Sequence, residues 1–352
     1  MSKELLNELI EETIHEGASD LHLLPNRHPV IRVSGQLVPL VKRPILSSEH
    51  TRGFISEFLT DGDQKLFLDR KEIDFSYAFK NQARFRGNGY FEKGVIAIAL
   101  RLIPRKIPTF QELNLPDVLE LFTKKRQGFF LVVGPMGHGK STTLASMVEL
   151  INATRAEHIM TIEDPIEYMY EEKLSIIDQR EVRIDTKDFK TALISMFRED
   201  VNVGLIGEMR DIETIGSAVT AAETGHLIFS TLHTNNAAQT IDRIIDIFPS
   251  GQQDQIRLQL ASSLSGIFSQ RLVPRISGGL IPAYELMIAN SAVANLIREK
   301  RSHEINTVVE TGVEQGMIDM NRCLADLVRR GEITSENAFA YSPNPQTMAR
   351  LL

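Results

Sequence analysis

The chain has 352 residues, of which 42% are hydrophobic and 22 are glycine, a composition typical of folded globular proteins that excludes collagen and extended disorder. Its 39 basic residues against 46 acidic ones give a net charge of −7, so general affinity for nucleic acid or anionic lipid is not expected. The length predicts two domains, and the lone Cys323 excludes an intrachain disulfide or a four-cysteine metal site and favours a reducing compartment.

Residues 1–20 are charged and amphipathic, and they lack the unbroken apolar core of a secretory signal. The longest apolar runs, such as 95–100 and 129–133, are far shorter than the roughly 18 residues that cross a bilayer. We therefore expect a cytoplasmic protein whose association with a membrane is only peripheral.

Residues 1–103 combine helical and strand-like patterns, which predicts an α+β domain. Apolar residues recur at helical spacing over 5–10, and a second helical stretch is expected at about 48–68. The strand-like runs lie at 21–24, 30–33, 37–40, 73–79, 83–90 and 94–102. Pro104, Pro108 and Pro116 then accompany a change of pattern, so we expect an interdomain linker over 104–117.

From residue 118 the pattern predicts an α/β domain that extends to residue 352. Apolar strands alternate there with amphipathic helices, as in a parallel sheet with crossover helices. Strands are expected at 129–133, 159–162, 203–206 and 227–232, and helices at 141–152, 186–198 and 212–223. From about residue 252 the pattern is mainly helical, so we expect a helical C-terminal region.

A glycine-rich segment between the first strand and the first helix of this domain predicts a nucleotide site. It reads GPMGHGKS and fits the phosphate-loop pattern G-x-x-x-x-G-K-[ST]. In such a loop backbone N–H groups surround the phosphates, the lysine reaches the β- and γ-phosphates, and the hydroxyl takes a Mg²⁺ position. The predicted nucleotide-binding residues are Gly134, Pro135, Met136, Gly137, His138, Gly139, Lys140, Ser141 and Thr142.

Polar residues end or follow the next three strands. Ligands of open α/β sheets bind at the carboxyl ends of strands, and Glu163 is well placed there to orient an attacking water. Glu208 resembles an acid that holds Mg²⁺ through water, and His233 follows the third strand. Taken singly, each of the three is also compatible with a structural role, but their order after a phosphate loop favours function.

Four segments, GPMGHGKSTT, TIEDPIEY, GEMRDIETI and TAAETGHLIFSTLHTNNAAQTIDRIIDIFP, resemble in order the Walker A, Asp box, Walker B and His box of the secretion ATPase superfamily. The similarity is greatest to the PilT-like retraction ATPases of type IV pili. ASDLHL resembles part of their N-terminal domain, so the resemblance covers nearly the whole chain. It implies an N-terminal PAS-like α+β domain over 1–103 and a RecA-like P-loop ATPase core over 118–352.

The resemblance also implies site roles, with ATP and Mg²⁺ as ligands. Lys140 and Ser141 would bind phosphate and Mg²⁺, Glu163 would activate the water, Glu208 would be the Walker B acid, and His233 would contact the γ-phosphate.

Arginines of the family's N-terminal domain complete the ATP site, and the resemblance maps them onto this chain. Arg86 and Arg101 match through the segments ARFR and ALRLIP, and Arg84 is a weaker match.

By the same resemblance, the protein would be a homohexameric motor at the cytoplasmic face of the inner membrane. Its partner would be the pilus platform protein, with pilin as the cargo. The alternatives are a pilus assembly or type II secretion ATPase and a weakly hydrolysing accessory module of the motor. Assembly ATPases usually carry a four-cysteine zinc insert, which one cysteine excludes. A DNA translocase is disfavoured by the acidic balance.

Three departures from the family pattern bear on these expectations. Ala294 stands where the retraction motif has arginine, and Val201-Asn202 replaces a Pro-Asp pair. The loop over 87–93 lacks the usual Gln-Arg-Gly. Coupling to retraction is therefore less strongly implied than hydrolysis.

Overall fold

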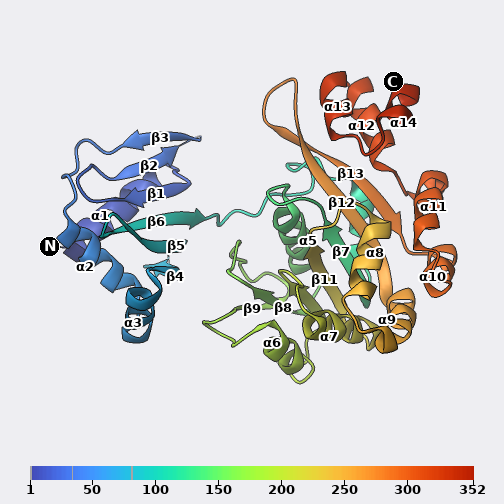
Figure 1. The fold of residues 1–352 in the computed structure, drawn as a ribbon, viewed down its shortest axis with the longest axis horizontal. Coiled ribbons are helices and arrows are strands. Elements are labelled where there is room, and N and C mark those ends of the chain that lie inside the picture. Colours follow the sequence, from blue (N-terminus) through green and yellow to red (C-terminus); the bar gives the residue numbers. More distant parts are fainter. Residues whose placement is uncertain (1, 34, 81) are drawn as a thin grey trace. The chain divides into compact units, whose positions relative to one another are not determined.

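The computed structural model describes residues 2–33, 35–80 and 82–352. It divides into two compact units (Figure 1). The first holds the residues up to Lys106 together with Glu167–Met169, and the second holds Ile107–Ile166 and Tyr170–Leu352. Within the described ranges, no helix combines the length and the hydropathy needed to span a membrane.

Over its described residues, the first unit is a six-stranded antiparallel sheet with three helices. Its strand order is β3-β2-β1-β6-β5-β4. The strands are β1 Asp20–Leu23, β2 Val30–Val33, β3 Gln36–Pro39, β4 Glu72–Phe79, β5 Ala83–Glu92 and β6 Val95–Ile103, and the helices are α1 Ser2–His15, α2 Ser48–Phe58 and α3 Asp61–Arg70.

The helical stretch predicted at 48–68 is in fact two helices. Leu59 adopts an extended conformation and ends α2, and the Thr60 side chain accepts a hydrogen bond from the Asp63 N–H to start α3. A threonine at this position satisfies one of the N–H groups that every helix start leaves without a partner. The break lets both helices contribute apolar side chains, including Phe54 and Phe67, to the core of the unit.

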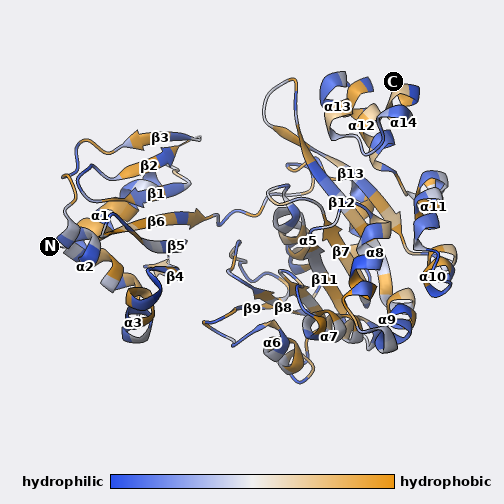
Figure 2. Cartoon of the chain, in the orientation of Figure 1, coloured by the Kyte–Doolittle hydropathy of each residue, from blue (hydrophilic) through white to orange (hydrophobic). Residues whose placement is uncertain are grey.

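The second unit is built on a seven-stranded sheet with the order β13-β12-β7-β11-β10-β8-β9. All neighbouring pairs are parallel except β12 with β13. The strands are β7 Gly128–Val133, β8 His158–Glu163, β9 Ile176–Glu181, β10 Val203–Ile206, β11 Leu227–Leu232, β12 Leu264–Pro274 and β13 Leu280–Ile288. The central strands β7, β10 and β11 are buried along their whole length, and the hydrophobic colouring of β7 and β11 is visible in Figure 2.

Helices pack around this sheet to give separate hydrophobic clusters. One cluster includes apolar residues of α5, and another includes those of α6 to α10. The helices are α4 Glu120–Thr123, α5 Lys140–Thr154, α6 Phe189–Met196, α7 Ile212–Glu223, α8 Ala237–Asp246, α9 Ser250–Ser263, α10 Ser291–Arg298, α11 Ile305–Thr311, α12 Met320–Arg329, α13 Ser335–Tyr341 and α14 Pro345–Leu351.

The helical region expected from about residue 252 is interrupted by a β-hairpin. After α9, the strands β12 and β13 extend the sheet, and the C-terminal helices begin only at Ser291. Gly278 and Gly279, with φ of 89° and 77°, lie in the connection between the two strands, where a residue with a side chain would be strained. Successive side chains of β12 point to opposite faces of the sheet, and Ile267 and Phe268 accordingly belong to different hydrophobic clusters. Because both faces are apolar, the sequence does not show the alternation of a half-buried strand, and the predicted helical pattern is wrong here.

Candidate functional site

The predicted site residues of the second unit converge at one edge of its sheet. Val133 pairs with Leu232 across β7 and β11, and Ile206 pairs with both Ser230 and Ile162 across β11, β10 and β8. Since these four strands are parallel, their carboxyl ends lie side by side. The residues that end or follow them therefore form a row in the spatial order of the strands: the phosphate loop, His233, Glu208 and Glu163.

The phosphate loop leaves β7 in a backbone conformation that requires glycine. Gly134 has φ of 143° and Gly139 has φ of 77°, values that L side chains rarely adopt. A Cβ at Gly134 would also lie 2.3 Å from the backbone oxygen of Gln270 on β12. Gly139 is the N-cap of α5 and has no side chain to cap the helix, so the first N–H groups of α5 are left to bind an anion.

Lys140 is buried and folded back over this loop. Its Nζ donates hydrogen bonds to the backbone oxygens of Gly134 at 2.9 Å and Pro135 at 2.8 Å, and it lies 3.3 Å from Nδ1 of His233. Ser141 and Thr142 follow on the first turn of α5, half-buried, whereas Met136 at the tip of the loop is 83% exposed. The lysine ammonium is thus held within the space that the loop encloses.

His233 is kept neutral by its surroundings. Burial lowers the pKa of His233, the Lys140 ammonium lowers it further, and the Glu208 carboxylate opposes both. A neutral imidazole beside the lysine can accept or donate one hydrogen bond without adding charge. This is the form suited to contact a phosphate oxygen or its attacking water.

Glu163 ends β8 and is 8% exposed. Its Oε1 accepts a hydrogen bond from the Thr161 hydroxyl at 2.7 Å. This bond, together with a longer one from Gln179 Nε2 at 3.5 Å, restricts the direction of the carboxylate, which otherwise rotates about three side-chain bonds. A buried, oriented carboxylate is the group that a water-activating role requires.

Glu208 lies two residues beyond the end of β10 and is ion-paired. Its Oε1 is 2.8 Å from Nε of Arg210. Gly207 packs beside the end of β8, because a Cβ there would be in van der Waals contact with the Cα of Glu163 at 3.4 Å. The Thr231 hydroxyl donates to the Gly207 oxygen at 2.6 Å and ties β11 to this turn.

Arg86 and Arg101 belong to the first unit, where they are directly opposite each other on β5 and β6. Asp20 on β1 pairs with Arg101 in turn, and its Oδ1 accepts a hydrogen bond from the Arg101 Nε at 2.9 Å. Burial alone would raise the pKa of Asp20, but hydrogen bonds from Ser19 and Arg101 outweigh it and lower that pKa. Both arginines are exposed on one face of the sheet, and Asp20 neutralises part of the charge at Arg101.

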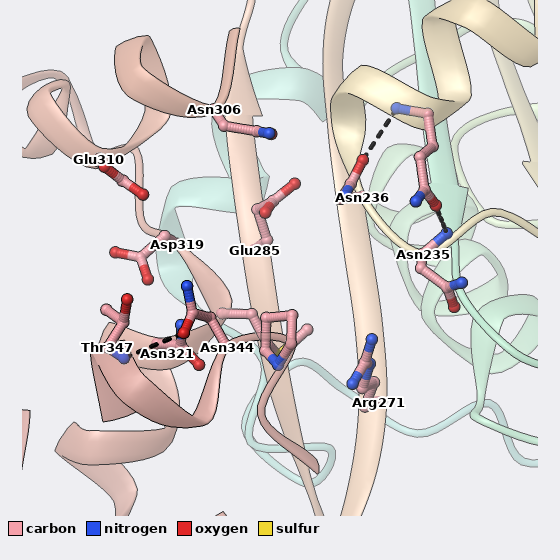
Figure 3. Close-up of a pocket in the computed structure, with 13 residues that line it drawn as sticks. Asn235, Asn236, Arg271, Glu285, Asn306, Glu310, Asp319, Asn321, Asn344 and Thr347 are labelled. Atoms are coloured by element: carbon pink, nitrogen blue, oxygen red, sulfur yellow. Dashed lines mark hydrogen bonds between the residues drawn. The ribbon is translucent and has the colours of Figure 1, made fainter. Parts of the chain in front are cut away.

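A cavity of about 430 Å³ lies beside the loop that follows His233 (Figure 3). Asn235 and Asn236 line it from this loop, and Arg271 and Glu285 line it from β12 and β13. Glu285 Oε1 accepts the Ala237 N–H at 2.9 Å at the start of α8. Burial raises the pKa of Glu285 to about 7, although the Ala237 hydrogen bond acts in the opposite direction.

Sequence reasoning missed the contribution of β12 to this site. Gln270 and Leu272 on that strand both hydrogen-bond to the phosphate loop. The signal was present in the sequence, because two apolar runs flank a Ser-Gly-Gly segment, which is the pattern of a β-hairpin.

The family model for type II/IV secretion system proteins matches residues 1–300. The chain is 43% identical to the type IV pilus retraction ATPase PilT of Pseudomonas aeruginosa, over 97% of this chain and 99% of that protein. It is 44% identical to a twitching motility protein of Neisseria gonorrhoeae, over 91% of this chain and 86% of that protein. The pilus assembly ATPase PilB of Thermus thermophilus is 32% identical over 78% of this chain, which corresponds to 31% of PilB.

Solved structures give the same relationship. The fold matches the pilus retraction motor PilT with bound ADP at a TM-score of 0.91 and 44% identity, over 98% of both chains. It matches the ATPase DotB of Legionella pneumophila at a TM-score of 0.77 and 25% identity, over 95% of this chain and 94% of DotB. The α/β architecture expected from the sequence is thus that of known ATPases.

Proposed function

The chain belongs to the type II/IV secretion system ATPase family and is an ATPase, and on this premise we propose that it powers the retraction of type IV pili. The observation that carries the proposal is the 43% identity to PilT of P. aeruginosa across almost the full length of both proteins. The match to the assembly ATPase PilB covers only 31% of that protein, which favours retraction over assembly.

The proposed motor is a homohexameric ring in the cytoplasm, at the cytoplasmic face of the inner membrane. Its N-terminal unit is PAS-like over 1–103 and is linked through 104–117 to a RecA-like core over 118–352. The ring acts on the membrane-embedded platform protein of the pilus, with pilin as the cargo. Hydrolysis would be converted into movement of the two units of each subunit, on the timescale of domain motions.

In this proposal the loop Gly134–Thr142 holds the phosphates of ATP. Lys140 exchanges its contacts with loop oxygens for phosphate oxygens, and neutral His233 contacts the γ-phosphate. Glu163, already oriented by Thr161, accepts the proton of the attacking water.

The side chains at the loop and at the end of β10 fit Mg²⁺. The Ser141 hydroxyl and, through water, the Glu208 carboxylate supply the oxygen ligands that this ion prefers. When bound, Mg²⁺ neutralises charge on the phosphates. Arg210 is ion-paired with Oε1 of Glu208, and the carboxylate has a second oxygen that can accept a hydrogen bond from a Mg²⁺-bound water.

Arg86 and Arg101 would stabilise the charge that develops during phosphoryl transfer. Their position on one exposed face of the first unit's sheet supports this role, because an exposed guanidinium can pair with a phosphate oxygen. An arginine used in this way accelerates phosphoryl transfer by about 10³ to 10⁵.

The test is motility in the organism that carries the gene. Deletion should abolish twitching but leave pili on the cell surface, and the wild-type gene should restore twitching. Glu163→Gln should not restore it, whereas Glu213→Gln, a change of a half-exposed carboxylate on α7, should. Loss of surface pili on deletion would instead identify an assembly motor.

A second measurement separates a motor from a weakly hydrolysing accessory module. Purified wild-type protein should release phosphate from ATP far faster than Glu208→Gln. Equal rates for the two proteins would contradict the motor assignment. Light scattering of the same preparation should give the mass of six chains.

A further inference from the structure

Strand β12 extends beyond the end of its neighbour β7, and the first residues of this extension lie beside the phosphate loop. The pairing of the two strands ends where Ser269 lies opposite Val133, whereas the pairing of β12 with β13 continues to Pro274. Backbone groups of 270–272 on the β7 side therefore need other partners, since buried backbone N–H and C=O groups are nearly always hydrogen bonded. The phosphate loop provides one of them, because the Leu272 N–H donates to Nδ1 of His138.

Gln270 joins the loop to the first turn of α5. This side chain is 2% exposed, its Nε2 donates to the His138 backbone oxygen at 2.8 Å, and its Oε1 accepts from the Thr143 hydroxyl at 2.7 Å. The backbone of Gln270 also lies directly against Gly134, because a Cβ added at Gly134 would lie 2.3 Å from the Gln270 backbone oxygen. One residue thus contacts the start of the loop, its fifth residue and the helix that follows.

His138 makes the reciprocal contact with its side chain. Its Nδ1 accepts the Leu272 N–H at 2.8 Å, so that nitrogen carries no proton. Burial lowers the pKa of His138, and the positive charges of Lys140 and Arg271 lower it further, which keeps the imidazole in the accepting form at neutral pH.

We propose that His138 and Gln270 are positioning residues that clamp the phosphate loop onto β12, and that the clamp requires a hydrogen-bond acceptor at the place of the His138 Nδ1 atom. Neither side chain needs to touch the nucleotide. Their effect is to hold the N–H groups of the loop in the geometry that binds phosphate, so that less order has to be imposed when ATP arrives. The inference rests on the proposed nucleotide site in this loop.

Two substitutions of His138 test the acceptor. Asparagine places its Oδ1 close to the position of the imidazole Nδ1, whereas alanine has no acceptor. One hydrogen bond contributes about 1 kcal/mol, so His138→Ala should weaken the binding of a fluorescent ADP analogue about fivefold and raise the KM for ATP similarly, with a smaller change in kcat. His138→Asn should bind within about twofold of wild type. His303→Ala, which changes an exposed histidine, controls for the loss of an imidazole.

A double-mutant cycle tests whether the two residues act as one clamp. Gln270→Met removes both hydrogen bonds at similar volume, and adding it to His138→Ala should weaken nucleotide binding by less than the product of the single effects. Three results would each overturn the proposal. The first is that His138→Ala binds nucleotide as tightly as wild type, and the second is that His138→Asn binds it as weakly as His138→Ala. The third is that the two substitutions have independent effects in the cycle. Lys140→Ala tests the nucleotide site separately, because the clamp is intact in that variant.

Discussion

Glu285→Gln should remove a pH dependence of the free energy of unfolding that comes from the buried Glu285 carboxyl. Burial of the Glu285 carboxyl raises its pKa from the ordinary 4.5 to about 7. Between these two values the folded protein keeps a proton that the unfolded chain has released, so the free energy of unfolding falls as pH rises. Each pKa unit corresponds to 1.36 kcal/mol, which gives a destabilisation of about 3 kcal/mol above pH 7 that is absent below pH 4.5.

Glutamine removes this titration and still offers an oxygen to the Ala237 N–H. From pH 5 to pH 8, the stability of Glu285→Gln relative to wild type should therefore increase by about 2 to 3 kcal/mol. Because other titrating groups are common to both proteins, the difference isolates this carboxyl.

Circular dichroism in a urea series at both pH values measures this difference, and it suits a chain without tryptophan. Glu314→Gln, an exposed acid in the short helix Val313–Gln315, is the matched control and should give no such trend. A difference between Glu285→Gln and wild type that is the same at pH 5 and pH 8 would refute the reasoning.

Three further predictions concern catalysis. Lys140→Ala should abolish ATP turnover, because the ammonium in the loop is lost; phosphate release at the wild-type rate would remove the basis of the nucleotide site. Thr161→Val deletes the hydroxyl that orients Glu163, so kcat should fall by about fivefold to tenfold with ADP affinity unchanged, and a change in affinity alone would contradict this role. Arg101→Ala should lower kcat, measured at saturating ATP, about 10³-fold or more. Arg105→Ala, a change beyond the end of β6, is the control. Equal rates for the two variants would count against the arginine assignment.

Much of the fold could be predicted from local patterns. The strands β7, β8, β10 and β11 were expected within one residue of their observed ends, because buried parallel strands are short apolar runs bounded by polar residues. The pattern missed β9, whose exposed side chains interrupt its hydrophobic signal. It also missed β12 and β13, where apolar residues on both faces of a strand resemble a buried helix.

The sequence by itself determined the chemistry that this protein can perform. A phosphate loop and three polar strand ends are local features, and glycine at 134 and 139 is required by the backbone conformation there. Only the tertiary structure decided which groups surround them. Lys140 and His233, 93 residues apart, are brought within 3.3 Å, and Gln270, more than 120 residues from the loop, is hydrogen bonded to it. Such contacts depend on strand order and register, which no local pattern encodes, because pairing in a parallel sheet joins segments that are distant in the chain.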